Sequence, residues 1–344
     1  MSSNKLWIRK TLAHQSGTPV PFNFSFTPPA RKKVEEYFGT TLIEETLDFP
    51  VRMSAPVSIK PLYADPARHG DTIRDEFGVI WSTNRLDRGS PTGPVLREPS
   101  LSGYEFPDPG AGYRFSELGG WCKDNEEHFT VIWVGDLWER ATFMRGMEDL
   151  LADVVWHPRF VEELLRGLTD YILGTMEILF ENFEFDGIAV SDDYGTQQSL
   201  IIPPELWRKL IKPRLAEIFT LAKRRNRVTF HHSCGNVESI VGDFIDLGLD
   251  ILHPIQPEAM DIYRLKSEYG SHLTFCGGIR TQDLLPRRTP GEVREETRTL
   301  KDLMGKGGGY ILEPGITLQD DVPLENILAM MEEAGIDLQK RTPA

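Results

Sequence analysis

The feature that most constrains the fold is a regular alternation of apolar strands and amphipathic helices from about residue 126 onward. Short apolar runs such as FTVIWVG at 129–135 predict buried strands, and apolar residues at helical spacing over 158–183 predict one of the intervening helices. Apolar strands joined by helical crossovers are typical of a parallel sheet covered by helices. The segments that contain the six predicted strands are 129–135, 186–195, 227–236, 250–256, 272–279 and 308–315.

Residues 1–125 differ in texture, because stretches such as FTPPAR, DRGSPTGP and FPDPGAG are too rich in proline and glycine for long helices. Short helices and loops are expected here, with a small β excursion around 73–100. If 19–26 is the first strand and one more lies before residue 125, the strand count reaches eight. We therefore predict an α/β fold, a single (β/α)8 TIM-barrel domain over 1–344, irregular over 1–125 and regular over 126–335. A doubly wound open sheet is the alternative, although no GxGxxG motif follows any strand.

The composition excludes several classes of protein. The formal net charge of −14 argues against binding to nucleic acid or to an anionic membrane, since both need a basic surface. No apolar run approaches the ~20 residues of a membrane span, and the first residues show no secretory signal. Three cysteines are too few for a disulfide scaffold. We expect a cytoplasmic protein with reduced cysteines.

Polar side chains gather at the carboxyl ends of the predicted strands, whereas the strand bodies are almost purely apolar. A barrel places its active site at these ends. Side chains of this edge should therefore supply the chemistry. The residues at the strand ends are Asn23, Asp192, Asp193, Tyr194, His231, His232, Cys234, Gln256, Cys276 and Glu313.

The sharpest motif in the chain is HHSCG at 231–235. His232 and Cys234 are alternate residues of an extended segment, so both can reach one ion. Imidazole and thiolate are ligands of Zn²⁺, and a catalytic zinc site has three protein ligands and one open position. Glu313 and Cys276 are the candidates for the third ligand. The alternative is that His232 is a hydrogen-bonded core residue and Cys234 a small buried hydrophobe.

Asp192 and Asp193 close one predicted strand, and alternation directs only one of them inward. The inward carboxylate can accept a proton or hold a polar group, while the other is expected to cap a helix or stabilise a loop. His253 lies in the middle of its strand and is interpreted as a barrel residue whose polar atoms are satisfied by hydrogen bonds. The predicted catalytic residues are Asp192, Asp193, Tyr194 and His231. The predicted substrate-binding residues are Asn23, Phe24 and Gln256.

Four segments, in order, resemble the uroporphyrinogen decarboxylase superfamily. The resemblance covers roughly 130–335 and implies a (β/α)8 barrel, in agreement with the strand count. The segments are DGIAVSDDYGTQQSLIIPPELWRKLIKPR, FHHSCGNVESIVGDFIDLGLDILHPIQPEAMD, LTFCGGIRTQDLL and GGGYILEPGITLQDDVPLENILAMMEEAG.

The superfamily contains two chemistries, and the sequence departs from one of them. The substrate of its decarboxylases is a porphyrinogen that bears many carboxylates. These enzymes bind it with a pair of arginines near an RQAGR motif. The corresponding region here reads PVPFNFSFTPPARKKVEEYF, with Asn23 and aromatic residues where those arginines would stand. Without that clamp, a polyanionic substrate is electrostatically disfavoured.

The other branch contains the cobalamin-dependent methyltransferases, and His232 and Cys234 match the His-x-Cys zinc pair of that branch. The later cysteine is missing, since the last strand continues as EPGITLQDD, so the resemblance leaves Glu313 or Cys276 to complete the site. No DxHxxG-type corrinoid motif is present, so a partner protein must supply the corrinoid.

We therefore predict a zinc-dependent methyltransferase that moves a methyl group between a corrinoid protein and a small methylated substrate, a methoxy compound, an amine or a thiol. A carboxylate ligand would suit demethylation at oxygen. The alternatives are metal-free decarboxylation of the uroporphyrinogen decarboxylase type and a ligand-binding barrel without activity. The substrate, the direction of transfer and the oligomeric state, for which a homodimer is one candidate, stay open.

Overall fold

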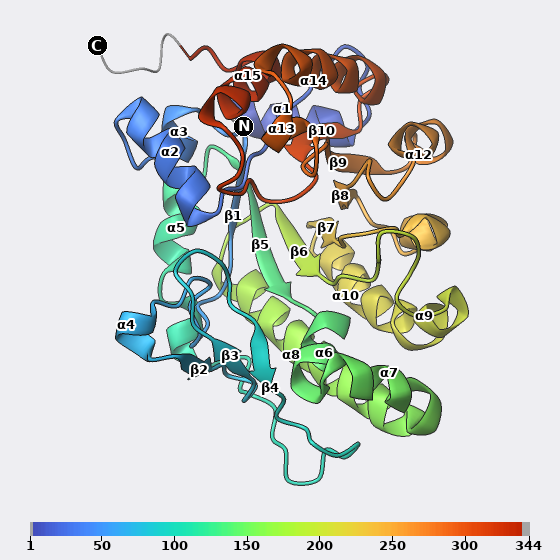
Figure 1. The fold of residues 1–344 in the computed structure, drawn as a ribbon. Helices are drawn as coiled ribbons and strands as arrows, with labels where there is room; N and C mark the ends of the chain where they lie inside the picture. Colours follow the sequence, from blue (N-terminus) through green and yellow to red (C-terminus); the bar gives the residue numbers. More distant parts are fainter. Residues whose placement is uncertain (1–2, 339–344) are drawn as a thin grey trace.

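The computed structural model describes residues 3–338, and its centre is a curled parallel sheet of seven strands (Figure 1). The strand order is β1-β5-β6-β7-β8-β9-β10. All six strands predicted after residue 126 are present, and β1 is the further strand predicted before residue 125. The strands are β1 (Val51–Ser54), β5 (Phe129–Gly135), β6 (Gly187–Ser191), β7 (Val228–His232), β8 (Ile251–Ile255), β9 (Thr274–Ile279) and β10 (Tyr310–Pro314).

The predicted strand at 19–26 is not a regular strand in the structure. Phe22 and Phe26 make isolated parallel bridges with Leu312 and Leu318, so this segment runs beside β10 at the edge of the sheet. Proline lacks the N–H that a ladder requires, and Pro21 contributes only its carbonyl, which accepts from the N–H of Leu312. Seven regular strands and an irregular eighth segment thus replace the predicted eight strands.

Helices cover the outer face of the sheet and follow most of its strands (Figure 1). The longest, α8, coincides with the helix predicted over 158–183, and its apolar stripe is buried. Within residues 3–338, no helix is long and apolar enough to cross a membrane. The α-helices are α1 (Ser3–Leu12), α2 (Pro28–Phe38), α3 (Ile43–Thr46), α4 (Pro66–His69), α5 (Leu118–Asp124), α6 (Trp138–Arg145), α7 (Met147–Trp156), α8 (Pro158–Asn182), α9 (Pro204–Leu210), α10 (Lys212–Arg224), α11 (Val241–Asp246), α12 (Ile262–Tyr269), α13 (Leu284–Arg287), α14 (Pro290–Met304) and α15 (Leu324–Ala334). Single 3₁₀ turns lie at Gly112–Phe115 and Glu238–Ile240.

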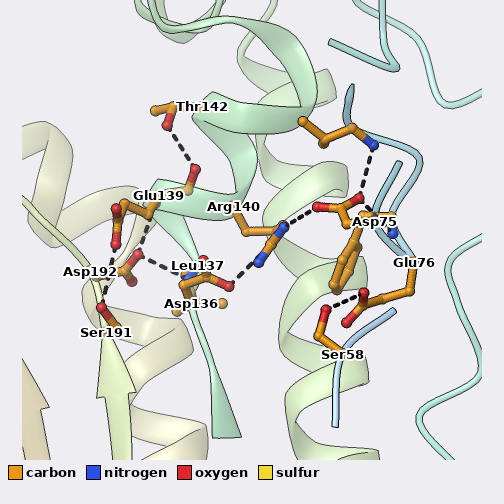
Figure 2. A network of polar contacts seen from close by, with 12 residues as sticks. Ser58, Asp75, Glu76, Asp136, Leu137, Glu139, Arg140, Thr142, Ser191 and Asp192 are labelled. Atoms are coloured by element: carbon orange, nitrogen blue, oxygen red, sulfur yellow. Dashed lines mark hydrogen bonds and ion pairs between the residues drawn. The ribbon is translucent and has the colours of Figure 1, made fainter. Parts of the chain in front are cut away.

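A small antiparallel sheet forms the β excursion that the sequence predicts around 73–100. It consists of β2 (Thr72–Arg74), β3 (Ile80–Ser82) and β4 (Pro91–Gly93). Asp75 joins it to the main body, since this carboxylate accepts from the Trp81 indole at 2.9 Å and from Arg140 of α6 at 2.8 Å. Figure 2 shows Arg140 between Asp75 and Asp136, where it makes a second ion pair of 3.1 Å. A partly buried cation with two carboxylate partners fixes this sheet beside the end of β5.

The inner face of the curled sheet is filled by apolar side chains over its amino-terminal half. Alternate strand residues point inward, and those of neighbouring strands pack into one cluster with Ile8 of α1. This packing leaves polar side chains at the carboxyl ends of the strands. The buried members of the cluster are Ile8, Val51, Phe129, Val131, Ala189, Phe230, Ile251, Cys276 and Ile311.

Candidate metal centre

Three predicted site residues converge where β6 and β7 end. The backbone register pairs Ser191 with His232 and His232 with His253, so the carboxyl ends of β6, β7 and β8 lie at one level. Asp193 follows β6 by two residues and Cys234 follows β7 by two. We call Asp193, His232 and Cys234 the outer triad; their donor atoms all lie within 4.8 Å of one another.

The spacing of the outer triad matches a tetrahedral zinc site. His232 Nε2 lies 3.3 Å from Asp193 Oδ1 and 3.5 Å from Cys234 Sγ. Zinc bonds of ~2.0 Å to nitrogen and oxygen and ~2.3 Å to sulfur, at tetrahedral angles, place these donors about 3.3 and about 3.5 Å apart. The His232 side chain is 23% exposed and that of Asp193 34%, so an ion held here would be open to a substrate.

A second donor set, the inner triad, is formed by His253, Cys276 and Glu313 from β8, β9 and β10. The Cys276 thiol donates to Glu313 Oε2 at 3.1 Å, and His253 Nε2 lies 3.6 Å from the same oxygen. Asn23 donates its amide N–H groups to both carboxylate oxygens, at 3.1 and 3.2 Å. Glu313 and Cys276 are buried, so this set lies deeper than the outer triad.

The two triads meet through their histidines. His232 Nδ1 lies 2.9 Å from His253 Nδ1, and the ring centroids are 4.9 Å apart. The sequence predicts His253 to be a barrel residue with satisfied polar atoms, and in the structure one of these atoms contacts the predicted metal ligand His232. The alternation of β8 carries the signal: His253 lies two residues after Ile251, whose side chain belongs to the inner apolar cluster, which indicates an inward side chain beside the end of β7.

Burial and close partners shift the acid–base properties of the outer triad in opposite directions. Burial acts to raise the pKa of Asp193, but hydrogen bonds from the His232 ring and from the Cys234 N–H outweigh it and lower this pKa to about 2. Burial acts to lower the pKa of His232, but Asp193 and Cys234 raise it to about 10. The anionic and cationic partners therefore hold each other in place.

In the inner triad, burial decides the direction of each pKa shift. Burial raises the pKa of Glu313 to about 7, although hydrogen bonds from Cys276 and Asn23 oppose it. Burial also raises the pKa of the Cys276 thiol, and the neighbouring Glu313 carboxylate adds to this. The pKa of His253 lies well below its usual value because the ring is buried. These shifts favour an uncharged thiol at Cys276 and an uncharged imidazole at His253 beside Glu313.

Three residues predicted to be catalytic lie away from this centre. Asp192 Oδ1 accepts from the N–H groups of Leu137 and Glu139, at 3.0 and 2.9 Å, at the start of α6 (Figure 2). The Tyr194 hydroxyl donates to Asp192 Oδ2 at 2.7 Å. His231 stacks on Tyr194, with ring centroids 5.5 Å apart.

The physical reason for this correction is strand alternation. His231 packs against Phe219 of α10 and Phe244 of α11, on the helix-covered face of the sheet. Successive residues of a strand face opposite sides, so an inward His232 requires an outward His231. Asp192 has the helix-capping role that the sequence predicts for one of the two aspartates, and Asp193 is the one beside His232.

The predicted substrate-binding residues divide into two groups. Asn23 and Phe24 line a cavity of about 920 Å³ that reaches His232, His253 and Glu313. Gln256 does not line it; its side-chain oxygen accepts from the N–H of Gly235 and so supports the loop that carries Cys234. The aromatic side chains that line the cavity are Phe24, Phe26, Phe49, Tyr63, Trp121, Trp133 and Phe230.

Glu139 is a site residue that the sequence analysis does not find, and it lies at the rim of the site. Its carboxylate accepts from the Ser191 hydroxyl at 3.4 Å (Figure 2). The same carboxylate pairs with Arg88 at 3.1 Å. Burial, followed by the charges of Asp193 and Asp136, raises the pKa of Glu139 to about 7. No sequence pattern identifies Glu139, because it lies in α6 rather than at the end of a strand. Only the turn between β5 and α6 brings its side chain close to the site.

Comparison with known proteins gives three findings. The sequence model of the family described as uroporphyrinogen decarboxylase (URO-D) matches residues 134–335. A methylcobamide:CoM methyltransferase MtaA of Methanosarcina barkeri is 26% identical over 146 residues, 42% of this chain and 40% of that protein. The protein of that name from strain Fusaro is 25% identical over the same shares, so the chain spans about two fifths of these relatives. A methyltransferase from Methanosarcina mazei shares the fold, with a TM-score of 0.71, 18% identity, and coverage of 97% of this chain and 98% of that one.

Proposed function

Because the chain belongs to the uroporphyrinogen decarboxylase family, we propose that it works in the methyltransferase branch of that family, as a zinc-dependent enzyme that moves a methyl group between a small methylated substrate and a corrinoid protein. The observation that carries this proposal is the outer triad, whose nitrogen, oxygen and sulfur donors have the separations of a tetrahedral zinc site. The partial relatives named methylcobamide:CoM methyltransferase support the same branch.

The ligands that we propose are His232, Cys234 and Asp193. The sequence favours Glu313 or Cys276 as the third ligand, but both belong to the inner triad, and Asp193 is the carboxylate beside His232 Nε2. Three protein ligands leave the fourth position for a substrate. The bound zinc would polarise the oxygen, nitrogen or sulfur atom that carries the methyl group.

The protein's own residues would bind and shield the substrate. The aromatic walls of the cavity, Phe24 and Trp133 among them, provide apolar surface for its methylated part and exclude water. At the rim, Glu139 and Arg88 form a charged pair that can hydrogen-bond a polar substituent. The corrinoid would arrive with its partner protein from the open side of the cavity.

The finer features of the fold are part of the proposal. We propose that the segment at 19–26 takes the place of the eighth strand, so that residues 1–344 act as one barrel domain.

A reduced, cytoplasmic setting would keep Cys234 available as a thiolate ligand. Metal-free decarboxylation stays the alternative function, although Arg31 and Arg88 of the cavity already pair with Glu44 and Glu139.

Metal analysis followed by a methyl-transfer assay tests the proposal. The purified protein should carry close to one zinc per chain, and His232→Ala or Cys234→Ser should lose it while the protein stays folded. With free methylcobalamin as the methyl donor, the zinc-loaded protein should methylate a thiol, an amine or a phenol. Wild-type protein that stays free of zinc after supplementation, or that shows no transfer, would contradict the proposal.

A further inference from the structure

A continuous row of polar contacts leads from the outer triad into the barrel. His232 Nε2 faces Asp193 and Cys234, and its other nitrogen, Nδ1, lies 2.9 Å from His253 Nδ1. On the far side of its ring, His253 Nε2 lies 3.6 Å from Glu313 Oε2. We infer that His253 and Glu313 are positioning residues that hold His232 with Nε2 free for a metal ion. This inference rests on the proposed zinc site and concerns residues outside its ligand set.

The proton count along this row allows one arrangement when a metal is bound. A histidine that ligates through Nε2 has its remaining proton on Nδ1. Nδ1 of His232 must then donate to Nδ1 of His253, because a contact of 2.9 Å between two nitrogens requires one donor and one acceptor. His253 in turn carries its proton on Nε2, directed toward the carboxylate of Glu313. His253 thereby fixes the tautomer of His232, and the negative charge of Glu313, 3.6 Å away, favours the matching tautomer of His253.

The same count of protons on the ring nitrogens means that the two triads cannot both hold a metal ion at the same time. If metals occupied both, Nε2 of His232 and Nε2 of His253 would both be ligands. Both Nδ1 atoms would then carry protons, and two N–H groups would face each other across 2.9 Å. One metal ion per chain follows, although the structure contains two donor sets.

The inner triad has partners of its own, which favours the outer triad as the metal site. The Cys276 thiol donates to Glu313, and Asn23 donates to both oxygens of that carboxylate. A metal at the inner triad would need a second buried anion beside Glu313, since the Cys276 side chain is 1% exposed. Cys276 and Asn23 therefore hold the Glu313 carboxylate in place at the end of the row of contacts that runs from His232 through His253.

Three variants and two measurements test the inference. His253→Phe keeps a ring but removes both nitrogens, whereas His253→Asn restores an acceptor beside His232 Nδ1. Ile251→Val, at a buried position of the same strand, is the control for a packing change. Zinc affinity is measured by competition with a chromophoric chelator. Co²⁺ loading, which gives a thiolate-to-metal absorption band, reports whether Cys234 remains a ligand.

We expect one metal per wild-type chain and a Kd for zinc that His253→Phe raises about 10- to 100-fold. His253→Asn should recover most of this loss, and Ile251→Val should leave the Kd unchanged. These three variants should all show the thiolate band at saturating Co²⁺, whereas Cys234→Ser should lose it. Equal affinity in wild type and His253→Phe would overturn the inference and leave the zinc site standing, as would two metals per chain. A thiolate band that survives Cys234→Ser would place the metal in the inner triad and overturn it too. Wild-type protein without metal would refute the proposed function itself.

Discussion

The backbone N–H of Cys234 donates to Oδ1 of Asp193 at 2.8 Å, so the loops that follow β6 and β7 are tied together at the centre of the site. The same carboxylate oxygen lies 3.3 Å from His232 Nε2. One side chain therefore fixes the backbone of a thiol donor and completes the donor set. Such preorganisation lowers the conformational cost of binding an ion.

Asp193→Asn separates the hydrogen bond to the Cys234 backbone from the binding of an ion by the carboxylate. The amide oxygen can still accept from the Cys234 N–H, but the ligand loses its negative charge. We expect zinc affinity to fall at least about 10-fold while the fold is retained, because removing a charged oxygen ligand weakens metal binding. Calorimetric titration with zinc measures the first effect and thermal denaturation the second. Unchanged zinc affinity would show that Asp193 is not a ligand.

Asp192→Asn is the matched control one residue away. We expect it to lower the stability of the fold and to leave zinc binding unchanged. The Asp192 carboxylate caps the start of α6 and accepts from the Tyr194 hydroxyl. An amide satisfies these donors less well, so we expect the unfolding free energy to fall by about 1–2 kcal/mol. Zinc content should stay close to that of wild type. Loss of zinc without loss of stability would argue against the structural role of Asp192.

The regular part of the fold can be predicted from the sequence because its signals are local. Apolar runs with helical crossovers indicate β5 to β10, and proline marks the starts of α8 and α9. The polar ends of these strands locate the site. His232 and Cys234 are also correctly predicted to be neighbours, since two alternate residues of one extended segment must point to the same side.

The rest depends on contacts that no local pattern encodes. Which of Asp192 and Asp193 points inward is decided by the register of β6 against β7 and by the start of α6. The contact between His253 and His232 joins two strands, so it follows from sheet pairing rather than from the motif. The segment at 19–26 has strand-like residues, but its prolines interrupt the ladder.

The ion pair of Arg31 and Glu44 gives a pH-dependent prediction outside the site. Two contacts of 2.5 and 2.8 Å join α2 to α3. Burial acts to raise the pKa of Glu44, but the hydrogen bonds from Arg31, a backbone hydrogen bond and the charges of Arg31 and Arg52 together outweigh it, so the pKa lies below its usual value of 4.5. The ionised pair therefore stabilises the fold above that value, and this contribution is lost as the pH falls through the lower folded pKa.

Glu44→Gln should accordingly lower the unfolding free energy by about 1 kcal/mol or less at pH 7, since the pair is partly exposed. At pH 3 the difference from wild type should shrink. Urea denaturation at the two pH values measures it, and Glu36→Gln, in an exposed pair with Lys32, is the control. A difference that grows on acidification would contradict the lowered pKa of Glu44.

Incubation with uroporphyrinogen III separates the two chemistries of the family. We expect no decarboxylation, because Arg31 pairs with Glu44 and Arg88 with Glu139 where a polyanionic substrate would need free arginines. Product analysis by chromatography measures the outcome. Coproporphyrinogen formed with a kcat of about 1 s⁻¹ or more would restore the decarboxylase alternative.

Glu313→Gln and Cys276→Ala test which triad holds the metal and how Glu313 acts on it. Glu313 contacts His253, which contacts His232, so an amide in place of the carboxylate weakens the row that orients the ligand. We expect Glu313→Gln to raise the Kd for zinc about 10-fold and to reduce methyl transfer with it.

Cys276→Ala removes only a thiol that donates to Glu313, so we expect a much smaller effect on zinc affinity and a modest loss of stability from the space left in the core. Chelator competition on both variants makes the comparison. Zinc retained in Glu313→Gln but lost in Cys276→Ala would mean that Cys276 is a ligand. The metal would then belong to the inner triad, and Asp193 and Cys234 would have to act on the substrate instead.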